Sequence, residues 1–531
     1  MNSLGKPPAL KPRQLRLPRV CVVVTGSSPA EMLDRAEQLT PQNTFLEFRL
    51  DYLAQPLSIL PRLQEFLALH RDVVAIATCR RAAAGGKFKG PVAAQAVILE
   101  KAVAAGCHLF DIELQSASRI APAQLAGARE RAAMMLSYHD FDATKDLETI
   151  FAGMQKIPAD YYKLVTTATS LRDNVAMMRF LEQHSDRYAV VGLCMGEQGL
   201  ISRMLGLRAG SVFTFAAPAP GLGTAPGQIA AHELRSTFRI EQLDAATRVY
   251  GVAGNPVAHS LSPVVMNAAM RRESVNAIYL PLHARTLKDL LACMRDIPLQ
   301  GVSITMPYKE SIIEHLENTD PQTSTIGACN TVVRAQDGKF YGFNTDMAGV
   351  LRPLEQRIPL PGAKILVLGA GGAARAAVFG LKTRGAEVFI LNRTADRAQK
   401  LARQAKARTL KRPELLKQRF DAILNATPVG MGRSGHSPLT QEEIRARFVF
   451  DFVYDAVETP LLRLARAAGA DTIPGIEMFA FQAAAQFEIW TGKPAPVEDM
   501  LQTAITARQR AENNKDRSEA GDPVRLRKTR H

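Results

Sequence analysis

Short apolar runs alternate with amphipathic stretches through the first 240 residues of the chain. Eight such runs occur, at 20–25, 44–50, 72–79, 109–114, 133–138, 161–167, 188–194 and 211–216. The stretches between them, such as 29–39, 91–105 and 171–184, place apolar residues at helical spacing. Nearly continuous apolar strands are typical of a parallel sheet buried on both faces. Eight strand–helix units in about 220 residues predict a (β/α)8 TIM barrel over residues 19–242.

The rhythm changes after Asp244. A new strand is expected at 248–253, and residues 247–346 are predicted to form one α/β lobe, which helices near 478–500 complete. Residues 347–477 are predicted to form a second lobe of the Rossmann type, because 364–391 has the pattern of strand, glycine-rich turn, helix and strand. The predicted fold class is therefore α/β, with an N-terminal TIM barrel followed by a two-lobed α/β unit.

The glycine-rich turn predicts a nucleotide site. It consists of Gly369, Ala370, Gly371, Gly372 and Ala373, where backbone N–H groups can approach a pyrophosphate at a helix N-terminus. The next strand ends in Asn392, Arg393 and Thr394, at the place where an NAD-binding fold usually has an acid. Arg393, with Arg397 one helical turn later, offers positive charge to the 2′-phosphate of NADP. A glycine loop alone is often an ordinary turn, but with both strands and this ending the sequence favours NADP(H) as the cofactor.

Charge is concentrated at the two ends of the chain. The 531 residues carry a net charge of +15, of which residues 1–19 supply +5 and residues 508–531 supply +4. Such basic ends are typical of solvated extensions, so 1–18 and 505–531 are predicted to be tails, the second disordered. The sequence contains no basic stripe with interleaved aromatic residues, which would indicate nucleic-acid binding. The remaining positive balance suits small anionic substrates.

The sequence favours a cytoplasmic enzyme without a metal site. The six cysteines are scattered and no histidine cluster has metal-ligand spacing, so reduced thiols and no structural zinc are expected. No stretch of 18 uncharged apolar residues could span a membrane, and residues 1–19 lack an apolar signal core. These residues are basic and acid-free, as in organelle presequences, but they are poor in serine and interrupted by proline. The oligomeric state stays open.

Two polar side chains at neighbouring barrel strands suggest covalent chemistry. Lys163 lies within the apolar run 161–167, where burial would push it toward its neutral, nucleophilic form. The alternative is a lysine at a strand end with its ammonium in water. His139 follows the preceding strand and is a candidate general acid or base. A lysine and a histidine on consecutive strands favour Schiff-base chemistry.

Further charged residues accompany this pair. Glu47, Arg49 and Asp51 are spaced two residues apart and therefore share one face of the second strand. Arg80 and Arg203 also follow strands, and each could hold a carboxylate with its forked donors.

The motifs of residues 19–240 resemble type I 3-dehydroquinate dehydratase. The resemblance is carried by Phe45-Leu-Glu-Phe-Arg49, Cys79-Arg80 followed by Gly85-Gly86, Ser137-Tyr-His139, Tyr162-Lys163, Met195-Gly196 with Ser202-Arg203, and Ala225-Pro-Gly-Gln228. It implies that Lys163 forms an imine with the substrate ketone and that His139 moves protons. It further implies that Arg203 binds the carboxylate, that Glu47, Arg49, Arg80 and Gln228 hold ring hydroxyls, and that Thr224 supplies a hydroxyl where the family commonly has serine.

One residue departs from this family pattern. The family usually has a glutamate directly before the Gly-Gly pair, where it is thought to orient the histidine, and this chain has Ala84. Acid–base catalysis contributes roughly 10²- to 10⁴-fold, so a misoriented histidine would leave a slow enzyme.

The C-terminal half contains a lysine and an aspartate suited to proton transfer. Lys309 follows the turn at 305–308, and Asp346 follows the strand near 342. Reduction of a ketone by hydride needs a proton donor, which this pair could supply; as an isolated ion pair it would mean little. Ser260 and Ser262 lie before a helix that Pro263 could start. The alternative for Ser262 is a helix cap.

Residues 250–500 resemble shikimate dehydrogenase. The resemblance implies that Lys309 and Asp346 are the catalytic pair and that the substrate is bound by Ser260, Ser262, Thr305, Asn330, Thr345 and Gln482. It implies a cofactor site made by 370–373, Asn392, Arg393, Thr394 and Arg397, with Thr427, Tyr454 and Gly475 at the nicotinamide and the cleft. Ser303 stands where many relatives have asparagine.

Together the two resemblances predict a TIM-barrel dehydratase fused to a two-lobed dehydrogenase with a Rossmann NADP-binding lobe. Such an enzyme would convert 3-dehydroquinate to 3-dehydroshikimate and then, with NADPH, to shikimate. Two alternatives stay open. Ala84 could leave the barrel slow or inactive beside a working dehydrogenase, or the C-terminal half could be an NAD-dependent quinate dehydrogenase.

Overall fold

The computed structural model describes residues 15–257, 260–432, 435–454 and 458–520. Parts of the predicted tails, 1–14 and 521–531, lie outside the described residues. The chain divides into two compact units, one of residues 1–247 with 288–297 and the other of 248–287 with 298–531. Each unit is described by itself below.

The first unit contains a sheet of eight strands in the order β7-β6-β5-β4-β3-β2-β1-β8, and its paired strands are all parallel. The strands are β1 (Val20–Val24), β2 (Phe45–Arg49), β3 (Val74–Thr78), β4 (Leu109–Glu113), β5 (Ala133–His139), β6 (Tyr161–Thr167), β7 (Val190–Met195) and β8 (Thr214–Ala216). Val212 N donates to Val190 O (2.9 Å), which links the two ends of the sheet. The predicted TIM-barrel architecture is confirmed.

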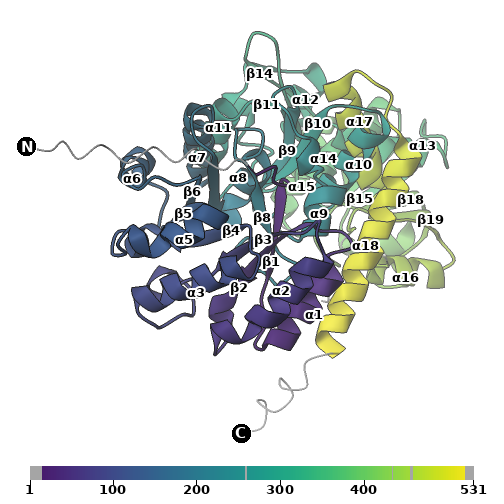
Figure 1. The fold of residues 1–531 in the computed structure, drawn as a ribbon. Helices are drawn as coiled ribbons and strands as arrows, with labels where there is room; N and C mark the ends of the chain where they lie inside the picture. Colours follow the sequence, from purple (N-terminus) through teal and green to yellow (C-terminus); the bar gives the residue numbers. More distant parts are fainter. Residues whose placement is uncertain (1–14, 258–259, 433–434, 455–457, 521–531) are drawn as a thin grey trace, which may run out of the picture. The chain divides into compact units, whose positions relative to one another are not determined.

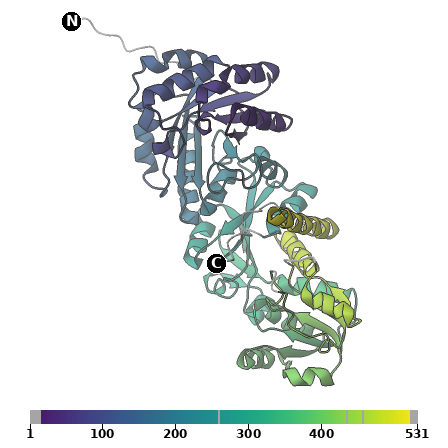
Figure 2. The ribbon, with the colours of Figure 1, turned by 90° about the horizontal axis from the view of Figure 1, so that it is seen from below.

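Helices follow the strands and cover the outside of the sheet (Figures 1 and 2). They are α1 (Pro29–Leu39), α2 (Leu60–Leu69), α3 (Val92–Ala104), α4 (Leu114–Ala117), α5 (Ala123–Arg131), α6 (Leu147–Met154), α7 (Leu171–His184), α8 (Leu200–Leu205) and α9 (Ala231–Ser236). Local sequence explains their starts. Ser28 caps α1, which begins with Pro29, and Ser170 and Asp173 form a reciprocal capping box at α7.

The unit also includes one helix from later in the chain, α11 (Leu287–Asp296), most of which clusters with the barrel residues. Asp289 accepts a hydrogen bond from the backbone N of Leu171 at the start of α7 (3.3 Å).

The barrel is followed almost at once by the second unit. The 3₁₀ turn Ile240–Gln242 ends the barrel, and β9 (Arg248–Gly254) begins after residues 243–247. This connection is held in place, because the Thr247 hydroxyl donates to Asp244 (2.8 Å) and Arg208 donates to the carbonyls of Ala245 and Thr247.

The first sheet of the second unit has the order β10-β9-β11-β13-β14-β12. Besides β9 it contains β10 (Ala277–His283), β11 (Leu299–Ile304), β12 (Asn318–Thr319), β13 (Thr331–Arg334) and β14 (Phe340–Phe343), with α10 (Ser262–Arg272), α12 (Pro321–Ile326) and α13 (Asp346–Glu355). Strand β13 runs antiparallel to both of its neighbours.

The second sheet is fully parallel, with the order β17-β16-β15-β18-β19-β20. Its strands are β15 (Lys364–Leu368), β16 (Glu387–Leu391), β17 (Arg408–Thr409), β18 (Phe420–Asn425), β19 (Ala446–Asp451) and β20 (Asp471–Ile473), and its helices are α14 (Gly372–Thr383), α15 (Ala395–Ala405) and α16 (Pro460–Ala467). Counted from β15, this is the 3-2-1-4-5-6 order of a Rossmann sheet. The switch point lies between β15 and β18, beside the glycine-rich turn.

Two C-terminal helices return to the first sheet of this unit: α17 (Gly475–Thr491) and α18 (Val497–Ala520), the yellow helices in Figure 1. Trp490 of α17 packs against Tyr250 and donates to Val332 O (3.1 Å). Met500 and Ala504 of α18 are buried against residues of α10. The predicted disorder from residue 505 is therefore wrong as far as Ala520, because the apolar positions of α18 pack on a neighbouring helix.

Candidate active sites

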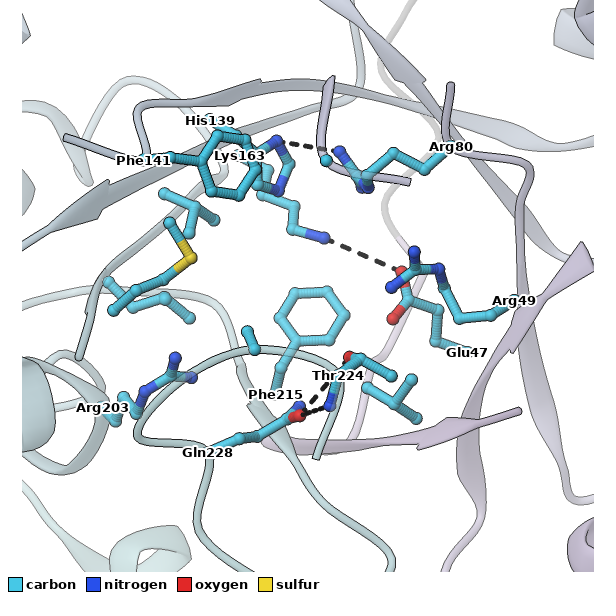
Figure 3. Close-up of a pocket in the computed structure, with 16 residues that line it drawn as sticks. Glu47, Arg49, Arg80, His139, Phe141, Lys163, Arg203, Phe215, Thr224 and Gln228 are labelled. Carbon is cyan, nitrogen blue, oxygen red and sulfur yellow. Dashed lines mark hydrogen bonds and ion pairs between the residues drawn. The ribbon is translucent and has the colours of Figure 1, made fainter. Parts of the chain in front are cut away.

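All eight residues predicted for the barrel site line one pocket (Figure 3). They are Glu47, Arg49, Arg80, His139, Lys163, Arg203, Thr224 and Gln228. The pocket encloses about 510 Å³, including space open to solvent.

Strand alternation explains why these side chains meet. Tyr161 and Val165, two positions on either side of Lys163, belong to the hydrophobic cluster inside the barrel. Because side chains two residues apart share a face, Lys163 must point inward. By the same spacing Glu47 and Arg49 follow Phe45 of that cluster. Along the barrel axis, the polar residues of the pocket lie toward the carboxyl ends of the strands, next to this apolar layer.

Lys163 is nearly inaccessible, with 4% of its surface exposed. Its Nζ lies 3.0 Å from Asp111 Oδ2, 3.8 Å from Glu47 Oε1 and 3.8 Å from the centre of the Phe215 ring. The surroundings of Lys163 are therefore not only apolar, as the sequence predicted, but also include carboxylates. Two carboxylates balance the charge of the buried ammonium, and Asp111 was not among the predicted residues.

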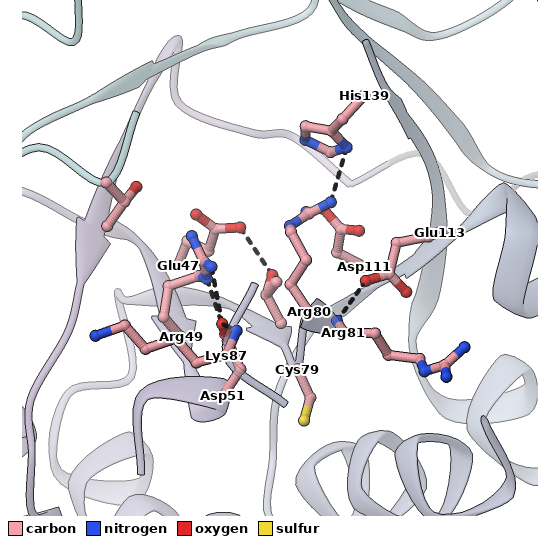
Figure 4. A network of polar contacts seen from close by, with 12 residues as sticks. Glu47, Arg49, Asp51, Cys79, Arg80, Arg81, Lys87, Asp111, Glu113 and His139 are labelled. Carbon is pink, nitrogen blue, oxygen red and sulfur yellow. Dashed lines mark hydrogen bonds and ion pairs between the residues drawn. The ribbon is translucent and has the colours of Figure 1, made fainter. Parts of the chain in front are cut away.

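His139 is held by Arg80 rather than by a carboxylate (Figure 4). Arg80 Nη1 lies 2.8 Å from His139 Nδ1. A guanidinium can only donate, so Nδ1 accepts and the proton of a neutral ring is on Nε2. Burial, together with the charges of Arg80 and Lys163, lowers the pKa of His139 well below its usual value. The Phe141 ring stacks on the imidazole, with ring centres 6.1 Å apart.

Arg203 is a buried cation without a carboxylate partner among the described residues. Its Nη2 donates to Pro226 O (3.2 Å), and its Nε has no partner in that part of the chain. Burial lowers the pKa of Arg203 to about 10. Its guanidinium lies across the pocket from Glu47 and Arg49 (Figure 3). Beside it, Gln228 Oε1 accepts from the backbone N of Thr224 (2.8 Å).

Buried carboxylates also fix the loop that contains Ala84. Glu113 accepts from the backbone N of Arg81 (2.9 Å), and Asp51 accepts from the backbone N of Lys87 (3.0 Å) while pairing with Arg49 (Figure 4). Between these anchors Gly85 approaches Phe141 so closely that a Cβ there would clash with the ring. The loop therefore supports Phe141, which in turn covers His139.

In the second unit Lys309 and Asp346 form the predicted pair. Lys309 Nζ lies 2.5 Å from Asp346 Oδ2, and the other carboxylate oxygen accepts from the Asn330 amide (2.8 Å). Asn330 also donates to the Thr345 hydroxyl (3.0 Å). A Cβ on Gly372, the first residue of α14, would lie 3.8 Å from Lys309 Cδ. The pair is therefore adjacent to the glycine-rich turn.

The remaining predicted substrate residues lie around Tyr279. Ser262 begins α10, its N donates to the Ser260 hydroxyl (3.2 Å), and its own hydroxyl bonds to the fully buried Tyr279. Tyr279 also bonds to Ser303 (2.6 Å).

Ser303 then links Tyr279 to α17, because its hydroxyl donates to Gln486 Oε1 (2.7 Å). Gln482, one helical turn earlier, donates to Phe479 O (3.0 Å), and the Tyr454 ring lies 5.1 Å from the Phe479 ring. Thr305 follows β11 and packs against Gly254. The sequence did not indicate Tyr279 or Gln486, because a buried tyrosine and a helix glutamine carry no distinctive motif.

The predicted cofactor residues lie at the switch point of the Rossmann sheet. Gly369 has φ +110°, and a Cβ there would lie 3.1 Å from Thr427 Cγ2, so the turn and the loop after β18 are in contact. Gly371 precedes α14, and a Cβ there would meet no atom within 4 Å. Ala370 and Ala373 are partly buried beside it. Gly475 begins α17, where a Cβ would lie 2.6 Å from Val453 O.

The residues after β16 face solvent. The Asn392 amide donates to Thr394 O (2.9 Å), which shapes the turn into α15. Arg393 and Arg397 are exposed. Their guanidinium groups are thus accessible to an anion.

Three further features of the described residues concern metal-binding clusters, membrane-spanning helices and the state of the cysteines. Within the described ranges no group of three or more His, Cys, Asp or Glu residues could hold a metal ion. No helix in that part of the chain is long and apolar enough to cross a membrane. All six cysteines are buried and unpaired by disulfides.

The fold and the two sites define a bifunctional α/β enzyme, a TIM barrel joined to a two-lobed dehydrogenase. Residues 20–245 match the family model of type I 3-dehydroquinase. Residues 252–332 match the substrate binding domain of shikimate dehydrogenase, 354–442 match shikimate/quinate 5-dehydrogenase, and 475–505 match the shikimate 5′-dehydrogenase C-terminal domain.

Similar proteins contain one or both parts. The chloroplastic bifunctional 3-dehydroquinate dehydratase/shikimate dehydrogenase of Arabidopsis thaliana is 32% identical over 507 residues, which is 90% of this chain and 83% of that protein. A shikimate dehydrogenase (NADP(+)) of Methanocella arvoryzae is 42% identical over 269 residues, 49% of this chain and 98% of that protein. Shikimate 5-dehydrogenase of Thermus thermophilus, solved with NADP(H) and shikimate, is 36% identical over 49% of this chain and all of that one, with a TM-score of 0.47. The chain belongs to the family of bifunctional 3-dehydroquinate dehydratase/shikimate dehydrogenases.

Proposed function

We propose that this chain dehydrates 3-dehydroquinate to 3-dehydroshikimate in the barrel and reduces 3-dehydroshikimate to shikimate with NADPH in the second unit. The observation that carries the first activity is the meeting of Lys163, His139 and Arg203 in one pocket. The second activity is supported by the Lys309–Asp346 pair beside the N-terminus of α14. The product of the first site is the substrate of the second.

In the barrel, the Lys163 ammonium releases a proton and the resulting amine adds to the ketone carbon of 3-dehydroquinate. Two protons from the lysine nitrogen leave with the carbonyl oxygen as water, and the nitrogen keeps one N–H in an iminium ion. The iminium acidifies the neighbouring C2–H bond, so His139 can take that proton and then return it to the departing hydroxyl. Arg80 occupies the lone pair of His139 Nδ1 in the structure. The ring becomes a base once the substrate hydroxyl takes the Nη1 donor of Arg80, while Nη2 keeps its bond to Asp111. Hydrolysis of the imine restores Lys163.

Binding groups surround this lysine on both sides. Arg203 suits the substrate carboxylate, because it is buried and lacks a counter-ion among the described residues. We assign the ring hydroxyls to Glu47, Arg49, Arg80, Thr224 and Gln228, which line the same pocket.

The second unit fits a dinucleotide at its glycine-rich turn. The open space at Gly371 leaves the N-terminus of α14 free for a pyrophosphate, and exposed Arg393 and Arg397 suit a 2′-phosphate. NADPH, when bound, supplies the hydride. Lys309 donates a proton to the carbonyl oxygen of the substrate, and Asp346 orients the lysine through their 2.5 Å contact.

The substrate of the second unit needs a carboxylate site and hydroxyl sites. Ser260 and Ser262, near the start of α10, suit the carboxylate. We assign its hydroxyls to Thr305, Asn330, Thr345 and Gln482, with Tyr454 at the border of the cleft.

A two-step assay tests the proposal. Purified full-length chain with 3-dehydroquinate should eliminate water, and added NADPH should then be oxidised. Borohydride with 3-dehydroquinate should leave a reduced adduct on Lys163, and Lys163→Ala should leave none while keeping the dehydrogenase activity. A folded wild-type chain that reduces 3-dehydroshikimate but gives neither elimination nor adduct would mean that the barrel is not a dehydratase.

A further inference from the structure

Asp111 contacts two residues that line the barrel pocket, Lys163 and Arg80, and the mechanism above leaves it without a role. It lies in the middle of β4, with 1% of its surface exposed. Its Oδ2 accepts from Lys163 Nζ (3.0 Å) and Arg80 Nη2 (2.8 Å), and its Oδ1 accepts from the Ser137 hydroxyl (2.6 Å). One carboxylate thus touches the predicted nucleophile and the arginine that holds His139.

The carboxylate is ionised in this position. Burial alone would raise its pKa, but the charges of Arg80 and Lys163 outweigh burial and hold the pKa of Asp111 well below its usual range. A buried charge is stable only when paired and hydrogen-bonded, and Asp111 has both kinds of partner. It is therefore a fixed negative charge rather than a proton acceptor.

We propose that Asp111 is the counter-ion of the iminium formed at Lys163 and that, through Arg80, it positions the ring of His139. The proposal rests on the imine chemistry proposed above and gives it a further residue. It also accounts for Ala84. A glutamate is expected there to orient the histidine, and in this chain the contact to His139 Nδ1 comes from Arg80, which Asp111 anchors.

The counter-ion role follows from where the charge sits during the reaction. When Lys163 adds to the ketone, a C–N bond forms, the carbonyl oxygen leaves as water, and the nitrogen keeps one N–H and the positive charge. This N–H replaces an ammonium N–H at a nitrogen that lies 3.0 Å from Asp111 Oδ2. The ion pair can therefore persist from ammonium to iminium, and hydrolysis returns it to the starting state. Glu47 is farther away, at 3.8 Å, and its Oε1 also accepts from Thr78 (2.8 Å).

The positioning role follows from the contacts that the two terminal nitrogens of Arg80 make. Nη2 is bound to Asp111, while Nη1 faces His139 at 2.8 Å and Ser137 at 3.4 Å. Figure 4 shows Arg80 between the carboxylate and the imidazole. A planar guanidinium fixed at one end has a defined direction at the other. Asp111 therefore sets the ring nitrogen on which His139 carries its proton.

Asp111→Asn in the full-length chain tests the inference, because it keeps the shape and removes the charge. We expect the dehydratase kcat to fall on the order of 10²-fold or more, KM for 3-dehydroquinate to change far less, and the borohydride adduct to form more slowly. The dehydrogenase activity of the same molecules should stay unchanged and reports on the intact chain. Asp160→Asn is the matched control, since Asp160 accepts from the backbone N of Met134 at the start of β5, at the other end of that strand from His139. It should retain the dehydratase kcat.

The result distinguishes this inference from the function on which it rests. If wild type forms the adduct and Asp111→Asn keeps a wild-type kcat and trapping rate, the inference is overturned and the proposed function stands. If wild type forms no adduct, the imine proposal itself fails. Should Asp111→Asn unfold the barrel, as seen by circular dichroism, Arg80→Lys decides. It keeps a charge for Asp111 but removes the Nη1 group that contacts His139. A kcat loss with little change in KM supports the positioning role, and wild-type kcat overturns it.

Discussion

Lys163 and Lys309 both lie beside an aspartate, yet their surroundings differ. The Lys163 side chain is 5% exposed and contacts Asp111, Glu47 and an aromatic ring. The Lys309 side chain is 22% exposed and contacts Asp346 at 2.5 Å. An enclosed amine can be protected from water while it is bonded to a substrate. A partly open ammonium can regain a proton from solvent after each turnover, which suits a donor.

Lys309→Met should separate the two activities. We expect the dehydrogenase kcat to fall roughly 10²- to 10⁴-fold, because the proton donor is lost, while water elimination from 3-dehydroquinate continues at the wild-type rate. Both activities are measured on the same preparation. A variant with an undiminished rate of NADPH oxidation would remove Lys309 from the proposed proton transfer.

The pH dependence of the dehydratase should reflect His139. Its pKa is lowered well below the usual value of about 6.5, and a general base works only while neutral. The ring therefore stays active as the pH falls, and kcat/KM should decline only at pH values well below the usual pKa of histidine. Ala84→Glu adds a carboxylate to the neighbouring loop, which favours the charged ring, so this variant should move the acidic limb to higher pH. An acidic limb at or above the usual histidine value in wild type would contradict this assignment.

Arg393 should determine the choice of cofactor. A hydrogen bond between charged groups is worth about 1.5–3 kcal/mol, so Arg393→Ala should raise KM for NADPH about tenfold to a hundredfold and leave KM for NADH nearly unchanged. Arg384→Ala is a suitable control, because Arg384 pairs with Glu355 at the other end of α14. An equal effect on the two nucleotides would place Arg393 away from the 2′-phosphate.

Most residues of the barrel pocket were predictable from the sequence, and Asp111 was not. Lys163, His139 and Arg203 lie in or after barrel strands, where polar side chains carry the chemistry of this fold. Asp111 sits within the apolar run 109–114, where a single carboxylate gives no sign of its partners. Those partners, Arg80 and Lys163, lie 31 and 52 residues away in sequence and meet Asp111 only through the pairing of β3 to β6.

At the scale of elements, the alternation of apolar runs and amphipathic stretches located every barrel strand. Each predicted run overlaps one of β1 to β8, because strands buried on both faces have little freedom in composition. The extent of the C-terminal helix was harder to predict. Residues 505–520 are mostly charged and polar, and the helix extends into them from the packing of Met500, Ala504 and Ala507 in the cluster with α10.

The α18 contact should contribute measurably to stability. Met500 is 1% exposed, and truncation of a buried methionine to alanine typically costs about 2–5 kcal/mol. Met500→Ala should therefore lower the unfolding temperature of the second unit, as followed by calorimetry. Exposed Gln502 on the same helix offers the control Gln502→Ala, which should leave this temperature nearly unchanged. Equal behaviour of the two variants would show that α18 does not stabilise the unit.

For the whole molecule, the two compact units predict two separable responses to ligands. A ligand stabilises only the folded unit that binds it, by about 2.7 kcal/mol at a hundred times its Kd. NADPH should therefore raise the unfolding temperature of one calorimetric transition and leave the other in place. Substrate trapped on the barrel with borohydride should raise the unfolding temperature of the other transition and leave the NADPH-sensitive one in place. A single transition that shifts with either ligand would mean that the units unfold together.

The connection at 243–247 fixes more than the order of the units. Arg208 of the barrel donates to the carbonyls of Ala245 and Thr247, so these five residues are held to the barrel and do not form a long free linker open to cleavage. Each molecule therefore carries one copy of each catalyst from synthesis to degradation. Expression of this chain therefore raises the amounts of both active sites together. The balance between producing and consuming the shared intermediate rests on rate constants and metabolite levels.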